Sequence, residues 1–130
     1  MKGFYDLKYD EEKDIVFLIW NKESKNLKDE EFLQVQDIYT EYIIEKKAKN
    51  TIVDIRNLNF AVRPSLQEKI AKKYYPKTIK AGLSKVAVIN SNELIAQISA
   101  EQMMEEAEAA PFQTKFFDEV KSAIQWLIKS

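Results

Sequence analysis

Hydrophobic residues in the first fifty positions predict two strands followed by a helix. Apolar side chains partly alternate with polar ones over residues 4–9, and residues 15–20 form a continuous apolar run rich in β-formers. The charged segment 10–14 between them is typical of a hairpin turn. From residue 29 to about residue 47, apolar side chains recur at helical spacing, with acidic residues in the first turn and lysines in the last. The apolar positions of this helix are Phe32, Val35, Tyr39, Tyr42 and Ile43, and Ile38 widens the stripe.

The second half of the chain repeats a strand followed by a helix. The pattern predicts strands at residues 51–55, 85–90 and 113–117, and helices at residues 66–75, 93–109 and 118–129. Strands flanked by helices pair in parallel through right-handed crossovers. The sequence therefore predicts a single-domain α/β fold with a mixed sheet of about five strands and about four helices. Its element order is β-β-α-β-α-β-α-β-α, with an antiparallel N-terminal hairpin and the remaining strands parallel.

Composition is that of an ordinary soluble domain, with 45% hydrophobic and 32% charged residues. Twenty Lys and Arg residues against 21 Asp and Glu leave a net charge of −1, which argues against nucleic-acid binding. No apolar run approaches the ~20 residues that span a bilayer. The chain has no cysteine and its start lacks an apolar signal region, so we expect a cytoplasmic protein.

The absence of histidine and cysteine removes most catalytic chemistry. It excludes Ser-His-Asp and Cys-His nucleophiles and zinc sites built from these ligands. Gly3 and Gly82 are the two glycines of the chain, too few for a Walker loop or a dinucleotide fingerprint. We therefore predict no catalytic residue, no cofactor and no metal.

Polar residues follow two of the predicted strands where ligands bind in open α/β sheets. Asp54 ends one strand with Asn57 beyond it, and Asn90 ends the next. A divalent cation requires several converging oxygens, and Asp54 is the one carboxylate that its position nominates. We favour a packed or capping role for Asp54.

A helix start is predicted near Ser65. Ser65 and Glu68 form a Ser-x-x-Glu capping box, and Pro64 biases Arg63 toward extended geometry. Ser65 could alternatively accept a phosphate, whose charge the helix dipole would favour. We favour the cap, because caps occur at most helix starts.

Residues 54–66 (DIRNLNFAVRPSL) resemble the hallmark stretch of STAS domains of the anti-sigma-factor-antagonist type. Asp54, Leu58, Phe60 and Leu66 match its pattern of a strand, an apolar step, a Phe and a helix entered through Asp-Ser-Ser-Gly-Leu. At the chain end, FFDEV and AIQWL (116–120 and 123–127) resemble the last strand and helix of small bacterial STAS/SEC14-like proteins.

The departures from that pattern concern the reactive positions. Val62 stands at the acidic position, Pro64 at the phosphorylatable serine, and Ser65 where the family has glycine. Proline has no hydroxyl, so the phosphorylation switch is not implied for this chain.

The resemblance implies a non-enzymatic module that docks a protein partner in signalling or regulation. The lysine-rich segment after the hallmark is either a solvated helix face or a docking surface for an acidic partner or lipid headgroups. Glu101, Glu105, Glu106 and Glu108 give the next helix an acidic side, and these opposite charges allow a homodimer. The predicted binding residues are Asp54, Arg56, Asn57, Arg63, Ser65, Lys69, Lys72 and Lys73.

An alternative function is a carrier of a small apolar ligand or lipid, of SEC14-like type. The ligand would lie between the sheet and the helix at 93–109 or 66–75. Met103 and Met104, with Pro111 and Phe112, could then form an apolar lip, although we favour core packing for them. A metal-dependent hydrolase using Asp and Glu ranks last, because no spacing nominates two carboxylates.

Overall fold

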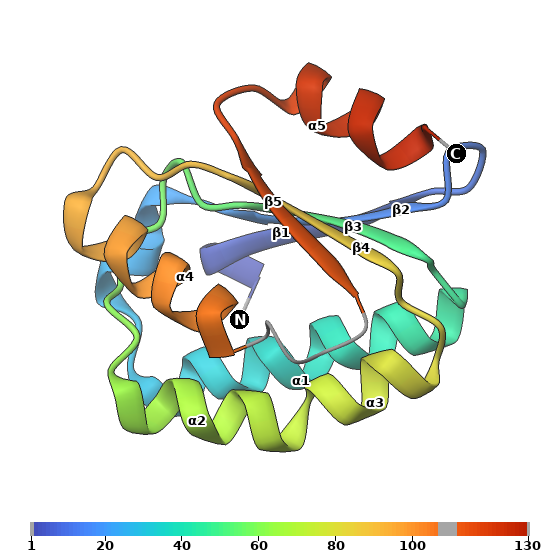
Figure 1. The fold of residues 1–130 in the computed structure, drawn as a ribbon. Coiled ribbons are helices and arrows are strands. Elements are labelled where there is room, and N and C mark those ends of the chain that lie inside the picture. The colour runs from blue at the N-terminus through green and yellow to red at the C-terminus, as the bar shows by residue number, and fades with distance from the viewer. Residues whose placement is uncertain (1, 107–111, 130) are drawn as a thin grey trace.

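Five strands form one mixed sheet, in the order β1 (Tyr5–Asp10), β2 (Ile15–Trp20), β3 (Asn50–Asp54), β4 (Lys85–Ile89) and β5 (Gln113–Phe117) (Figure 1). The computed structural model describes residues 2–106 and 112–129. β1 pairs with β2 antiparallel, and every later pair of neighbours is parallel. The predicted α/β class, the sheet composition and the order of the elements are confirmed.

The connecting helices lie on one face of this sheet. They are α1 (Asp29–Lys46), α2 (Pro64–Lys73), α3 (Tyr75–Lys80) and α4 (Leu94–Glu106), and the last helix is α5 (Val120–Ile128). The 3₁₀ helices η1 (Lys2–Phe4) and η2 (Lys22–Asn26) flank the first hairpin. Figure 1 shows α1 to α4 below the sheet and α5 alone above it. Crossovers of one hand that always lead to the next strand in the same direction place their helices on one face.

β2 is apolar at successive positions because both of its faces are covered. Val16, Leu18 and Trp20 pack into the larger core, between the sheet and α1, α2 and α4. Ile15 and Phe17 pack into the smaller core, between the other face of the sheet and α5. A strand buried on both sides reads as a continuous hydrophobic run, which is what the sequence shows.

The helices differ from the prediction mainly between β3 and β4. The helix expected at 66–75 begins at Pro64 and ends at Lys73, and a second helix, α3, follows it. Pro76 lies in the first turn of α3, where its missing N–H costs no hydrogen bond. The helix expected at 93–109 runs from Leu94 to Glu106, and residues 107–109 lie outside the described part of the chain. No helix in residues 2–106 or 112–129 has the length and hydrophobicity to cross a membrane.

The predicted capping box at Ser65 is wrong. Arg63 is the N-cap of α2, with extended dihedral angles (φ −64°, ψ 152°), and no side chain caps the helix. Pro64 itself adopts helical geometry, so Ser65 lies inside the first turn and Glu68 pairs with Lys72 instead. The Arg63 guanidinium pairs with Asp29 at the start of α1.

One expected core position of α1 is also wrong. Ile38, which we expected to widen the buried stripe, is 40% exposed. The buried side of α1 is narrower than its sequence suggests, because Phe32, Val35 and Ile43 fill the contact with the sheet.

Candidate functional site

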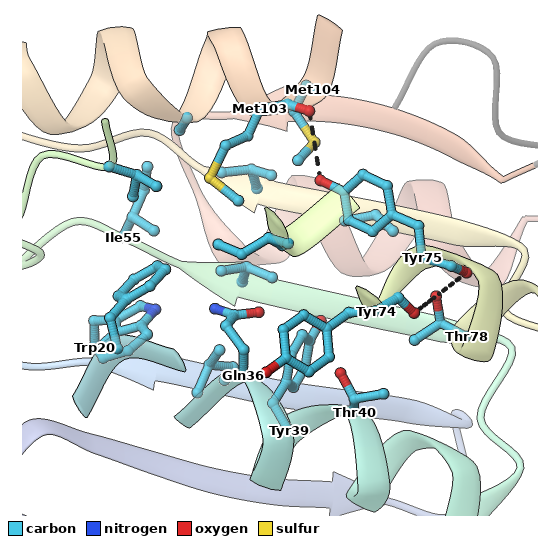
Figure 2. Close-up of a pocket in the computed structure, with 18 of the residues that line it drawn as sticks. Trp20, Gln36, Tyr39, Thr40, Ile55, Tyr74, Tyr75, Thr78, Met103 and Met104 are labelled. Atoms are coloured by element: carbon cyan, nitrogen blue, oxygen red, sulfur yellow. Dashed lines mark hydrogen bonds between the residues drawn. The ribbon is translucent and has the colours of Figure 1, made fainter. Parts of the chain in front are cut away.

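A cavity of about 110 Å³ lies inside the larger core, between the sheet and helices α1 to α4. Side chains of β2, β3 and β4 line it on one side and side chains of the four helices on the others. Figure 2 shows Trp20, Gln36 and Tyr39 at one end of this space and Met103 and Met104 at the other. No Asp, Glu, Lys or Arg belongs to the lining among the described residues. The cavity is therefore an uncharged, mainly apolar space within a packed core.

The end of α4 and the start of β5 close one side of the cavity. Met103, Met104 and Phe112 all line it, so these residues contribute both to the core and to the cavity wall. The Tyr75 hydroxyl donates to the Met103 carbonyl at 3.4 Å, and the Tyr75 and Phe112 rings meet edge to face with centroids 5.5 Å apart. Pro111, which we grouped with these residues, lies outside the described part of the chain.

The cavity exists because α4 turns its small side chains inward. Ala96, which is 2% exposed, and Ala100 line the space. Leu94 and Ile95, on the same helix, are 72% and 61% exposed. A short inward side chain leaves volume that a leucine would fill, so the orientation of α4 creates the empty space.

The tyrosine hydroxyls of the lining are bonded within the protein. The Thr51 hydroxyl donates to the Val16 carbonyl at 2.9 Å, so its oxygen accepts from the Tyr39 hydroxyl at 2.7 Å. The Tyr74 hydroxyl donates to a carboxylate oxygen of Asp37 at 2.7 Å. Burial raises the pKa of Tyr39, burial and the Asp37 bond raise the pKa of Tyr74, and the same bond lowers the pKa of Asp37. Both phenols therefore stay neutral.

Gln36 supplies a polar group that the fold leaves available. Its amide makes no hydrogen bond to another residue of the described chain, and Figure 2 shows it lying between Trp20 and Tyr39. Thr40, one turn further along α1, also lines the cavity. A carboxamide both donates and accepts, so Gln36 can bond to either kind of polar group.

Asp54, predicted at a ligand-binding strand end, is bonded to its own neighbour instead. Its buried carboxylate accepts from the Arg56 backbone N–H at 3.1 Å and from the guanidinium Nε at 3.0 Å and Nη2 at 2.6 Å. The bonds to Asp54 raise the pKa of Arg56. Three donors from one residue occupy this carboxylate, which confirms the packed interpretation.

Ser24, which sequence analysis did not single out, holds the connection between β3 and α2. Its buried hydroxyl donates to the Asn57 carbonyl at 3.3 Å and accepts from the Asn59 backbone N–H at 2.9 Å. Ser24 lies in η2, more than thirty residues earlier in the chain. A serine in a polar link carries no pattern that would reveal such a contact.

Two further side chains attach the end of this connection to α2 and α4. The Val62 N–H donates to the Ser99 hydroxyl at 3.1 Å, and the Gln67 amide donates to the Val62 carbonyl at 2.6 Å. The Gln67 amide also donates to the Gln102 side chain at 3.1 Å. These bonds position α4 over the cavity. For Gln67 the available signal was its inward position in the amphipathic helix α2, whereas α4 has no such pattern to reveal Ser99.

The remaining predicted binding residues lie apart from the cavity. Lys72 pairs with Glu68 at 2.8 Å, and Lys73 lies 3.4 Å from Asp37. The structure thus separates the expected surface site from the cavity. The predicted binding residues that are exposed, none of which lines the cavity, are Arg56, Asn57, Arg63, Ser65, Lys69, Lys72 and Lys73.

Comparison with known proteins identifies no relative from which a site can be transferred. No protein-family model and no curated protein matches the chain. Within residues 2–106 and 112–129, no group of three or more Asp, Glu, His or Cys side chains could hold a metal ion. The cavity and the exposed residues predicted to bind a partner are therefore the features from which a function can be argued.

Proposed function

We propose that this protein is a non-enzymatic binding module whose cavity takes a small neutral molecule that is mainly apolar. The observation that carries the proposal is the apolar space of about 110 Å³ inside the larger core. An apolar cavity of about 150 Å³ stays dry and binds benzene or xenon. The volume suits a ligand about the size of benzene or a short alkyl chain. This restricts the ligands of the carrier function predicted from the sequence to small molecules.

The polarity of the lining defines the guest further. A charged group inside the cavity would have no opposite charge among the lining residues, and burying an unpaired charge is very costly. A single hydroxyl or carbonyl can bond to the Gln36 amide. The expected ligand therefore has an apolar body and one uncharged hydrogen-bonding group.

Trp20 provides the assay, because it lines the cavity and stacks on Phe32 with ring centroids 5.3 Å apart. The variant Trp126→Phe leaves Trp20 as the sole tryptophan. Titration with hexan-1-ol should change its fluorescence saturably, whereas hexanoate at neutral pH should not. In this background Gln36→Leu should weaken hexan-1-ol about threefold to tenfold, the equivalent of one hydrogen bond, and leave hexane unaffected.

Two results would contradict ligand binding in the cavity. One is the absence of any saturable change with either guest, and the other is equal affinity for hexanoate and hexan-1-ol. Native mass spectrometry of freshly purified protein gives an independent test, because a co-purifying small neutral mass supports a carrier.

A second candidate function is the docking of a protein partner by a STAS-type module without the phosphorylation switch. Its support is the course of residues 55–63, which lead from the end of β3 into α2 with Pro64 as the first helical residue. Arg56, Ser65 and Lys69 are exposed around this connection. In this proposal the protein is cytoplasmic and Ser65 is not modified. Phosphorylation mapping in native cells, combined with affinity purification, tests it, and stoichiometric phosphate on Ser65 would refute it.

A further inference from the structure

The outward face of α4 carries large hydrophobic side chains that the fold does not cover. Leu94, Ile95 and Ile98 are 72%, 61% and 41% exposed. In residues 2–106 and 112–129, the other exposed large hydrophobic residues are Ile38 on α1 and Ile128 on α5, each on a different helix. Scattered exposed apolar residues are normal, whereas a contiguous group marks an interaction surface.

The charge along this face changes from one end of α4 to the other. Exposed Glu101 and Glu105 follow Ile98 at spacings of three and seven, so they continue the line on which Leu94 and Ile98 lie. No Lys or Arg occurs in α4. The face is therefore apolar in its first two turns and acidic in its last two.

We propose that this face of α4 docks an amphipathic helical segment of a protein partner, with apolar side chains at one end and Lys or Arg at the other. An apolar face packs against apolar side chains of the facing helix, and complementary charge fixes register and orientation. The thirteen residues of α4 span about 20 Å, so the partner segment has about three to four turns.

The charge pattern favours this occupant over two others. A second copy packed through the same face would bring no cation to Glu101 and Glu105, because α4 lacks basic residues. An anionic bilayer would repel the same two carboxylates. A helical segment with apolar side chains at one end and Lys or Arg at the other can pack against the apolar half of the face and pair with its acidic half.

The docking proposal does not depend on ligand binding in the cavity. Leu94, Ile95 and Ile98 are absent from the cavity lining, which takes Ala96 and Ala100 from the opposite side of the same helix. Either activity can therefore be lost in a variant that keeps the other.

The experiment uses synthetic helical peptides of fourteen residues as probes. One has leucines on one face of its first two turns and lysines on that face of its last two, and a second reverses the order of the two halves. Matched peptides carry Glu in place of Lys. Binding of labelled peptide to the full chain is followed by fluorescence anisotropy, and one lysine peptide should bind at least about tenfold more tightly than its glutamate counterpart.

Variants then locate the binding surface. Ile98→Ser should weaken the lysine peptide about tenfold or more, and Ile38→Ser, at an almost equally exposed position of α1, should leave it unchanged. Glu101→Gln combined with Glu105→Gln should also weaken it and reduce the dependence of binding on salt.

Other outcomes overturn the proposal. They are the failure of both lysine peptides to bind, equal binding of the glutamate peptides, and an equal loss in Ile38→Ser. A dimer in sedimentation velocity that Ile98→Ser dissolves would assign the face to a second copy instead. Binding to phosphatidylcholine–phosphatidylserine vesicles that Ile98→Ser abolishes would assign it to a membrane.

Discussion

Replacing Ala100 with leucine fills the cavity from α4 and should stabilise the protein. An empty core cavity costs about 24 cal/mol per Å³, so about 110 Å³ corresponds to about 2.6 kcal/mol. The three added carbons of Ala100→Leu are worth about 0.8 kcal/mol each when buried, or about 2.4 kcal/mol together. Because the leucine must also adopt one rotamer among Met103, Met104 and the strands, we expect a net gain of about 1–2 kcal/mol in the free energy of unfolding.

The measurement is urea unfolding of wild type and variant, followed by tryptophan fluorescence and by far-UV circular dichroism. Ala71→Leu is the matched control, because Ala71 is a half-buried helical alanine on α2 that does not line the cavity. It should gain much less. The same Ala100→Leu protein should also lose the binding of hexan-1-ol, since leucine occupies the space of the guest.

A destabilised Ala100→Leu protein would refute the reasoning, because it would show that the space cannot accept three carbons without strain. A stabilised protein that still binds hexan-1-ol with unchanged affinity would place the ligand elsewhere and refute the proposed site. An equal gain from Ala71→Leu would attribute the effect to the helix and not to the cavity.

Three further predictions concern the groups that hold the site together. Ser24→Ala should lower the free energy of unfolding by about 1–3 kcal/mol, because it leaves the Asn59 N–H without its acceptor, whereas exposed Ser122→Ala should be neutral in the same urea assay. Tyr39 contributes stability that is complete below pH 10 and lost as pH rises toward its raised pKa, so Tyr39→Phe should flatten the alkaline fall in unfolding free energy. A fall of equal slope in both proteins would contradict this. The pKa of Asp37 is lowered, so its contribution to the free energy of unfolding is complete above pH 3.8 and disappears as pH falls through the lowered pKa. Asp37→Asn should remove that part of the fall in stability at acid pH. An unchanged acid dependence in the variant would refute this prediction.

The elements could be predicted from the sequence because local patterns determine them. The run at 15–20 is apolar at every position, and a strand between two helical layers requires this. Strands separated by helices leave parallel pairing as the expected arrangement, and the sheet has it. The expected extended geometry of Arg63 before Pro64 is present, but α2 begins at Pro64, two residues earlier than expected, because proline fits the first helical position.

The errors arose where two local signals competed. Ser65 and Glu68 have capping-box spacing, yet Pro64 enters the helix first and moves the N-cap back to Arg63. The helix expected at 66–75 ends at Lys73, and Pro76 lies in the first turn of a new helix, α3. In each case the helix boundary lies at a different residue from the one that the local sequence pattern indicated.

The sequence by itself determined the strands, the helices other than α3, the order of these elements and the lack of histidine and cysteine chemistry, because periodicity and composition are properties of neighbouring residues. The tertiary structure alone decided which side of α4 faces inward. Ala96 and Ala100 point into the core and Leu94 and Ile98 out of it, which simple burial of the larger side chains would not predict. The bonds of Val62 to Ser99 and of Gln67 to Gln102 fix that orientation across segments more than thirty residues apart. The cavity and the exposed face both follow from it.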